Sequence, residues 1–148
     1  MENWITTLSN LNGIFAVAAW PNGSIGQILT LFAMTFSVIY HAIETQKHCM
    51  PGIKPFATGT VFQHHLCINL DRIAAGSLGL YLTYLVFSLR HWDLLVKGCL
   101  AIALNLLSEI FRFYPSPFNE QMTKNWYVLW HSLWHLAAFH MSWTIAAL

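Results

Sequence analysis

The residues most able to do chemistry in this sequence are two histidines, His131 and His135, set four positions apart. They lie in the apolar segment WYVLWHSLWHLAAFHMSW at residues 126–143. Residues four apart on a helix stack on one face, so the two imidazoles could bind a single metal ion. Two ligands do not complete a metal site. The rest of the chain must therefore supply a third ligand and a group that handles protons.

The composition indicates the environment in which such a site would lie. Of the 148 residues, 56% are hydrophobic and only 9% are charged, and the mean hydropathy is +0.50. Soluble domains average about 25% charged residues, so we predict a single-domain integral membrane protein that crosses the bilayer several times. A net charge of +1 provides no basic surface for nucleic acid, which excludes that class of partner. The sequence carries no signal for the compartment or the oligomeric state.

The hydropathy pattern predicts an all-α transmembrane helix bundle with four clear spans. Crossing a bilayer takes roughly 20 mostly apolar residues. Residues 4–20 are apolar but interrupted by polar side chains, which predicts an imperfect N-terminal helix. Residues 44–65 are polar and predict a loop, with His64 and His65 in solvent. The predicted spans cover residues 24–43 with Ser24 as cap, from about 66 or 71 to 89, 94–113 and 126–148.

The alternation of spans brings the polar side chains to one face of the membrane. The first clear span ends there with His41, the next begins there with Asp71, and the last begins there with the histidine pair. Polar groups at that depth are costly unless they are paired, bind a metal or face water. Three imidazoles with an open fourth position are the ligand set of catalytic zinc, which activates a bound water. Asp71 would accept a proton from that water, and Ser37 could hydrogen-bond the water or a developing oxyanion.

Each of these side chains also has an ordinary structural interpretation. A single histidine near a membrane interface is more often a boundary residue than a ligand, and a histidine pair could instead bind b-type haem. Ser37 could bond only a carbonyl of its own helix, and Asp71 could cap the helix that it begins. Glu109 and Arg112, three residues apart, are predicted to neutralise each other. These separate interpretations leave the clustering on one face unexplained.

Three short segments resemble, in order, the signatures of the CREST superfamily of membrane hydrolases. That superfamily includes alkaline ceramidases, the progestin and adipoQ receptors, GPI-remodelling Per-type proteins and the myomaker branch. The tyrosine before the first histidine and the acidic residue three after it make the chain most similar to the myomaker and GPI-remodelling branches. The segments are SVIYHAIE at 37–44 with Ser-x-x-x-His, NLDRIAAG at 69–76 with the aspartate, and HSLWHLAAFH at 131–140 with His-x-x-x-His.

The resemblance implies a membrane hydrolase in which zinc is held by His41, His131 and His135. Through a zinc-bound water, it would cleave an amide or ester bond of a membrane lipid, with Ser37 and Asp71 as the accompanying catalytic pair. The superfamily usually has seven spans, whereas this sequence predicts four and an imperfect one. The myomaker branch implies an alternative, a non-enzymatic membrane-remodelling or fusion protein in which the metal is structural.

Overall fold

The chain is all-helical in the part that the structure describes, which confirms the all-α part of the predicted fold class. The computed structural model describes residues 3–44, 52–53, 56–57, 60–114 and 119–148, and these ranges contain no strand. Parts of the predicted loop, residues 45–51, and the proline stop at 115–117 lie outside the described residues. The helices are α1 (Trp4–Ser9), η1 (Asn10–Asn12), α2 (Gly13–Ala19), α3 (Ile25–Ile43), α4 (Val61–Leu89), α5 (Trp92–Phe113) and α6 (Glu120–Ala146).

Three of these helices are long and apolar enough to cross a membrane. They are α3, α4 from Phe62 onward, and α5. α6 has sufficient length at 27 residues, but it carries many polar side chains and is not among the candidate spans of the described chain. The finding supports a membrane protein, and the fourth predicted span is not confirmed.

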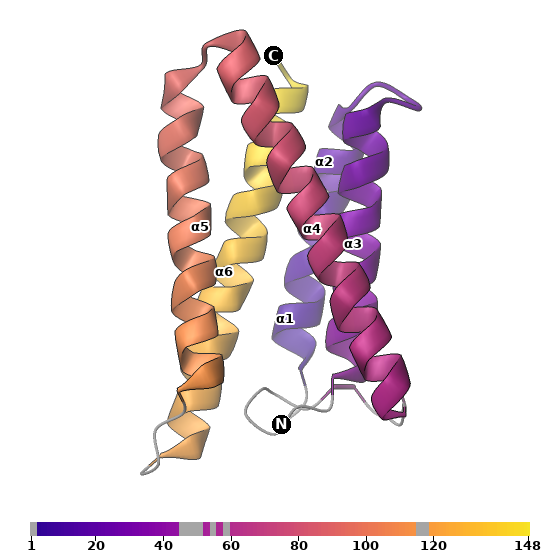
Figure 1. Ribbon diagram of the computed structural model, residues 1–148, viewed down its shortest axis with the longest axis vertical. Coiled ribbons are helices and arrows are strands. Elements are labelled where there is room, and N and C mark those ends of the chain that lie inside the picture. The colour runs from indigo at the N-terminus through magenta and orange to yellow at the C-terminus, as the bar shows by residue number, and fades with distance from the viewer. Residues whose placement is uncertain (1–2, 45–51, 54–55, 58–59, 115–118) are drawn as a thin grey trace.

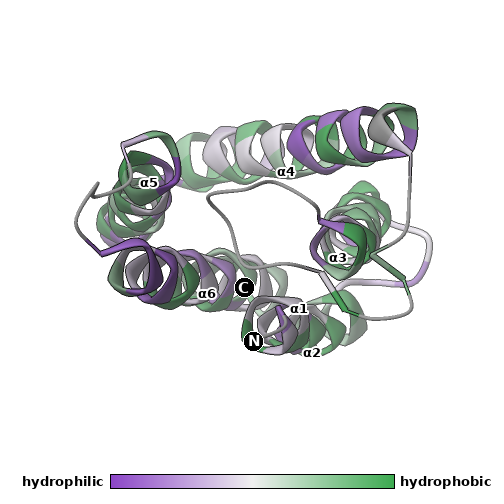
Figure 2. Ribbon diagram, turned by 90° about the horizontal axis from the view of Figure 1, so that it is seen from below, coloured by the Kyte–Doolittle hydropathy of each residue, from purple (hydrophilic) through white to green (hydrophobic). Residues whose placement is uncertain are grey.

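The long helices run side by side around a common interior (Figure 1). Seen along the bundle, the order around the ring is α3, α4, α5, α6 and then the short pair α1 and α2 (Figure 2). α6 packs extensively on α5, and α4 packs mainly on α3. Because α4 is tilted, it lies near α5 at the turn that joins them and diverges from α5 toward the other end of the bundle (Figure 1).

Capping side chains set where α3 and α4 begin. The Ser24 hydroxyl accepts from the backbone N–H of Gln27 at 3.2 Å, as predicted for α3. Thr60 and Gln63 form a reciprocal capping box that starts α4 before the predicted residue 66. His64 was predicted in solvent, and this prediction is wrong: the longer helix buries it to 6% exposure. Polar residues that hydropathy assigns to a loop here form the first turns of a helix.

The N-terminal segment is broken, as predicted, and its polar side chains face inward. The 3₁₀ turn η1 separates α1 from α2. From Trp4 to Ala19 the segment is roughly 24 Å long at 1.5 Å per residue, short of the roughly 30 Å hydrocarbon layer. Its outward side chains are apolar, namely Trp4, Ile5, Leu8, Leu11, Ile14 and Phe15, and its buried polar ones are Asn3, Thr6, Thr7 and Asn10.

The bundle interior divides into an apolar half and a polar half. The apolar core lies toward the turn between α4 and α5, whereas the opposite half gathers buried polar groups from α1, α3, α4, α5 and α6. The apolar core includes Ala16, Trp20, Ala33, Leu78, Leu82, Val86, Leu94, Phe139, Met141 and Ile145. The polar half includes His41, Glu44, His64, Asp71, Ser108, Arg112, His131 and His135.

Candidate metal centre

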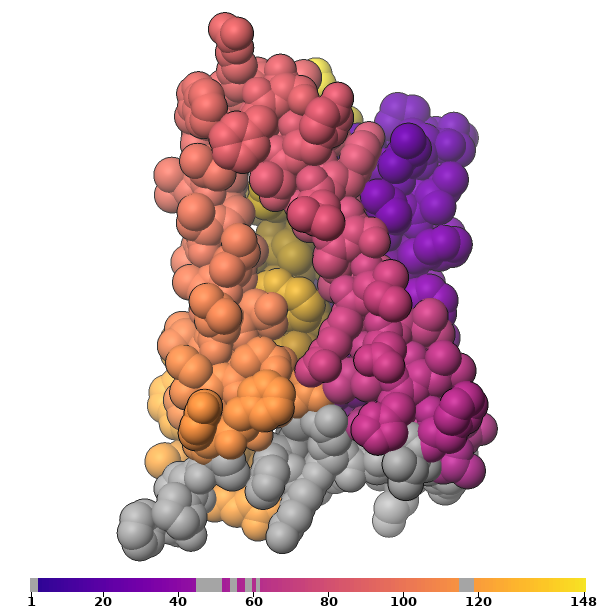
Figure 3. All heavy atoms as spheres, in the orientation of Figure 1, coloured from indigo at the N-terminus to yellow at the C-terminus, as the bar shows by residue number. Residues whose placement is uncertain are grey.

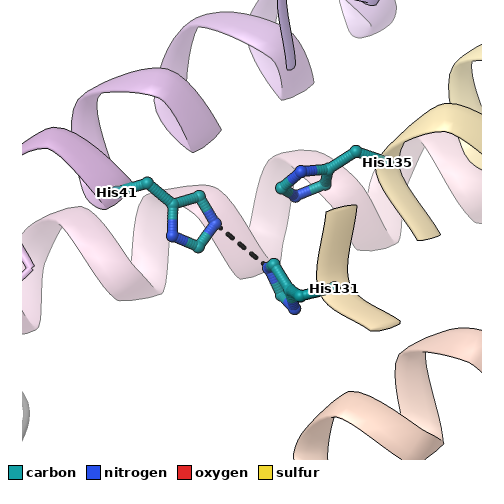
Figure 4. A group of neighbouring side chains, drawn as sticks. All are labelled: His41, His131 and His135. Carbon is teal, nitrogen blue, oxygen red and sulfur yellow. Dashed lines mark hydrogen bonds between the residues drawn. The ribbon is translucent and has the colours of Figure 1, made fainter. Parts of the chain in front are cut away.

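Three histidines converge in the polar half of the bundle, where the sequence predicts them (Figure 4). His41 comes from the last turn of α3, and His131 and His135 come from one face of α6. All three are at most 4% exposed, and their ligand nitrogens lie within 4.8 Å of one another. The Nε2 atoms of His41 and His131 are 3.0 Å apart. Tetrahedral metal–nitrogen bonds of about 2.0–2.1 Å separate two ligands by roughly 3.3 Å. The triad could therefore hold a metal ion.

The same distance argues against haem. Two axial nitrogens on opposite sides of an iron atom, with bonds of roughly 2 Å in line, would be about 4 Å apart. The Nε2 atoms of His41 and His131 are closer than this, and His135 joins them from the same side as His131.

The outer nitrogen, Nδ1, of each ring also has a polar partner. Histidines that bind metals in proteins commonly bond a second group through the ring nitrogen that faces away from the metal, and this bond fixes the orientation of the ring. The contacts are His135 with Ser9 Oγ at 2.9 Å, His131 with Ser108 Oγ at 3.1 Å, and His41 with Glu44 Oε2 at 3.2 Å.

The two serine hydroxyls are acceptors toward the rings. Ser9 donates its only proton to the carbonyl of Thr6, and Ser108 donates its proton to the carbonyl of Asn105, each at 2.7 Å. Toward an imidazole, each oxygen can then only accept. Both rings on α6 therefore carry their proton on Nδ1 and present an Nε2 lone pair to the interior. The Nδ1 atom of His41 has two neighbours, an acceptor in Glu44 Oε2 at 3.2 Å and a donor in Asn3 Nδ2 at 3.4 Å, so the tautomer of this ring depends on which of the two it bonds.

Glu44 is fully buried and stands at the centre of a polar network. Its carboxylate accepts from Asn3 Nδ2 at 3.0 Å and from the Tyr40 hydroxyl at 2.5 Å. Arg112 donates to the Tyr40 hydroxyl at 2.9 Å and to Glu109 at 3.2 Å, which is the predicted ion pair. These donors allow a carboxylate to remain charged inside the bundle and to orient the imidazole next to it.

The two predicted catalytic residues line a cavity of about 130 Å³ that reaches the triad. Ser37 Oγ lies 3.3 Å from Nε2 of His135. Asp71 is 6% exposed and interacts with the Ser37 hydroxyl. Its Oδ1 atom has no hydrogen-bond partner among the described residues. A buried carboxyl group thus lies beside the imidazoles, and one of its oxygens has no hydrogen-bond partner among the described residues.

A second cavity of about 440 Å³ opens the site sideways between α4 and α5. It shares Asp71, Gly79 and Trp134 with the smaller cavity, and its polar end is formed by Arg112 and His131. The space-filling view shows the hollow between these two helices with α6 behind it (Figure 3). In a bilayer, this side of the bundle would face hydrocarbon.

The serine and asparagine side chains behind the triad are not predicted from the sequence. Ser9 and Ser108 belong to no motif, and Asn3 lies in a segment predicted only as an imperfect helix. One signal was present: Asn3, Thr6 and Asn10 recur at spacings of three and four, which is typical of one helical face. A polar face on a short helix among membrane spans indicates a polar interior.

No protein family, no curated protein and no solved structure matches the chain. The fold and the site nevertheless define a class. In the described residues, this is an all-helical protein with three helices able to cross a membrane and a buried cluster of three histidines that could hold a metal ion.

Proposed function

We propose that the protein is a zinc-dependent hydrolase that cleaves an amide or ester bond of a membrane lipid, with His41, His131 and His135 as zinc ligands. The orientation of the three rings carries this proposal. Each Nδ1 has an outer partner, the Nε2 atoms of His41 and His131 lie 3.0 Å apart, and one ligand nitrogen of each ring lies within 4.8 Å of the others. This is the arrangement in which imidazoles bind a metal ion.

Electrostatics favours a cation at this point. When His41 directs its Nδ1 proton to Glu44, the Nε2 atoms of His41 and His131 face each other as two acceptors 3.0 Å apart. Two lone pairs at this distance repel each other unless a positive charge lies between them. Three histidines with a fourth position open to water or substrate are a ligand set of catalytic zinc, which prefers tetrahedral geometry.

Bound zinc would supply an activated water and polarise the carbonyl of the substrate. Asp71 accepts the proton of the water and delivers it to the leaving amine or alcohol. The Ser37 hydroxyl donates a hydrogen bond to the carbonyl oxygen as negative charge develops there. The reaction consumes one water and yields a carboxylic acid and an amine or alcohol. The opening between α4 and α5 would let a lipid reach these groups from within the bilayer.

We further infer that α6 is a fourth span and that the chain belongs to the CREST superfamily. α6 runs beside α5 along the bundle (Figure 1). Its exposed side includes Leu129, Leu136 and Trp143, which recur every seven residues and form an apolar stripe suited to lipid. The order of the three motifs along the chain supports membership, and their meeting around one point agrees with it.

Metal analysis of the purified protein tests the site. We expect one zinc per chain in the wild type and background zinc in a variant carrying His131→Ala and His135→Ala. His140→Ala is the matched control, because this histidine is exposed on the same helix and should leave the zinc content unchanged. A wild-type protein without zinc, or a double variant that retains it, contradicts the assignment.

The Asp71→Asn variant separates hydrolysis from a structural role of the metal in the same experiment. In a hydrolase, this variant should keep its zinc and lose at least about a hundredfold in the rate of lipid cleavage, because the proton acceptor is gone. In a membrane-remodelling protein with a structural metal, Asp71→Asn should keep both zinc and function. An Asp71→Asn variant that keeps both zinc and function would contradict the proposed hydrolase and support the non-enzymatic alternative.

A further inference from the structure

Asn10 lines the smaller cavity and has no part in zinc hydrolysis as proposed. Asn10 lies on η1, is fully buried and lines the cavity together with Ser37, Asp71 and His135. Its Nδ2 donates to the carbonyl of Thr6 at 3.0 Å. A carbonyl oxygen only accepts, so this bond fixes which end of the amide is nitrogen. The other end, Oδ1, finds no donor among the described residues.

A buried oxygen without a donor is costly, and native proteins rarely retain one without a reason. Among the described residues that line this cavity, two fully buried polar side-chain atoms lack a partner, and both are acceptors, Asn10 Oδ1 and Asp71 Oδ1. Apart from a few polar groups at the triad end and Thr83, the wall is apolar or small, with Ala75, Leu78, Leu82, Ala101, Ile102 and Phe139. The occupant that complements this space brings a hydrogen-bond donor at one end and hydrocarbon at the other.

We propose that Asn10 is a specificity-determining residue that selects a secondary amide, because its Oδ1 accepts a hydrogen bond from the N–H of an acyl amide. The hydrocarbon of the ligand lies along the apolar wall, which opens toward the bilayer between α4 and α5 (Figure 3). This inference rests on the proposed function, since it chooses between the amide and the ester named there.

An ester of the same shape cannot satisfy this acceptor. It presents an oxygen where the amide presents N–H, so two acceptors would face each other in a buried site. Sites built to bond a donor reject analogues that lack it, because the polar group of the site is then left unpaired. Asn10 and Ser37 line the same cavity of about 130 Å³, so one small functional group can contact both. Asn10 would accept a hydrogen bond from the N–H of the amide, and Ser37 would face its carbonyl.

Three ligands with the same hydrocarbon chain test the proposal on the wild-type protein in detergent micelles. They are N-methylhexadecanamide, which has the N–H, N,N-dimethylhexadecanamide, which lacks it, and methyl hexadecanoate, the ester of matching shape. Each competes with a brominated fatty amide that quenches Trp134, a residue lining both cavities. Trp134→Phe identifies its share of the fluorescence. We expect the N-methyl amide to bind roughly tenfold or more tightly than the other two.

The Asn10→Leu variant should bind all three ligands with similar affinity, because it keeps the bulk of the side chain and removes the acceptor. Asn12→Leu is the matched control, since Asn12 lies on the same turn but lines a different cavity with Phe15 and His140. It should keep the wild-type preference. Equal binding of amide and ester by the wild type overturns the proposal. So does an Asn12→Leu variant that also loses the preference for the N-methyl amide. The readout needs no hydrolysis and no zinc, so failure of the proposed enzyme would be seen separately in metal content and turnover.

Discussion

Ser9 is a single residue, outside any motif, that sets the protonation pattern of a candidate metal ligand. Its hydroxyl donates to Thr6 and accepts from Nδ1 of His135 at 2.9 Å. This pair of bonds leaves the Nε2 lone pair of His135 inside the bundle, where Ser37 Oγ lies 3.3 Å away and the ligand nitrogens of the triad lie within 4.8 Å of one another. Mutation of a group that hydrogen-bonds a metal ligand typically lowers the metal affinity by a factor of about 10 to 100. Ser9 is therefore a positioning residue, and it comes from the N-terminal helix that is too short to span.

We expect Ser9→Ala to weaken zinc binding by about tenfold or more, because His135 loses a partner that fixes its ring. Competition with a chelating dye measures the affinity, and the electronic spectrum of the cobalt-substituted protein reports the ligand geometry. Ser9→Thr keeps the hydroxyl and should restore both readouts. Ser142→Ala is the control: this fully buried hydroxyl bonds Trp20 and Thr30 away from the triad. If Ser142→Ala lowers the affinity equally, the effect of Ser9 is general destabilisation.

The contrast between the histidines and the serines shows what a sequence reveals about a site. His131 and His135 are predictable because helical spacing fixes their common face, and His41 follows from the direction of the spans. Ser9 and Ser108 are not predictable, since a serine meets an imidazole only at one particular rotation of its helix. That rotation depends on the packing of α1 and α5 against α6, which no local pattern encodes.

Among the elements, α2 and α3 are joined by an unusually close contact. A Cβ atom on Gly26 would lie 2.4 Å from the Trp20 ring, so the indole rests directly on the backbone of α3. The same indole donates to Ser142 on α6 at 3.0 Å. One glycine thus allows one tryptophan to connect three helices of the apolar half.

Gly26→Ala should lower the free energy of unfolding by about 1–3 kcal/mol, because the added methyl group displaces the indole. Gly76→Ala on α4 is the matched control. A Cβ there meets nothing within 4 Å, and the gain in helix propensity should raise stability by roughly 0.5–1 kcal/mol. Unfolding in mixed micelles, followed by circular dichroism, compares the two. Equal destabilisation by both substitutions would show that the contact with Trp20 is not the cause.

The bounds of the elements were predictable where hydropathy and helix ends coincide. α3 and α5 end within a few residues of the predicted spans, whereas α4 and α6 both begin earlier than predicted. Thr60 starts α4, and Asn119 caps α6 before Glu120, although Trp126 was the predicted start. Outside the hydrocarbon layer a helix can continue through polar residues, so capping side chains, rather than hydropathy, fix its first turn.

At the scale of the molecule, the meeting of the motifs depends on the number of crossings and little else. Each span reverses the chain, so the end of α3, the start of α4 and the start of α6 reach the same end of the bundle (Figure 1). The sequence alone predicts this. It does not predict the tilt of α4 or the opening toward lipid, because both follow from how the helix faces pack. The triad thus forms at one end of the bundle, next to the opening between α4 and α5.

Labelling of the helix ends tests whether α6 crosses the membrane. The C-terminus lies beside the turn between α4 and α5, at the end of the bundle opposite the N-terminus (Figure 1). With α6 as a fourth span, Thr60 and Asn119 lie on one side of the membrane and His91 and Leu148 on the other. Single cysteines at these positions, in a chain whose three native cysteines are replaced by serine, can be labelled in sealed vesicles with an impermeant maleimide. We expect Leu148→Cys to react together with His91→Cys. Reaction of Leu148→Cys with Asn119→Cys instead would place α6 on one side of the bilayer and would take the last two imidazoles out of the membrane.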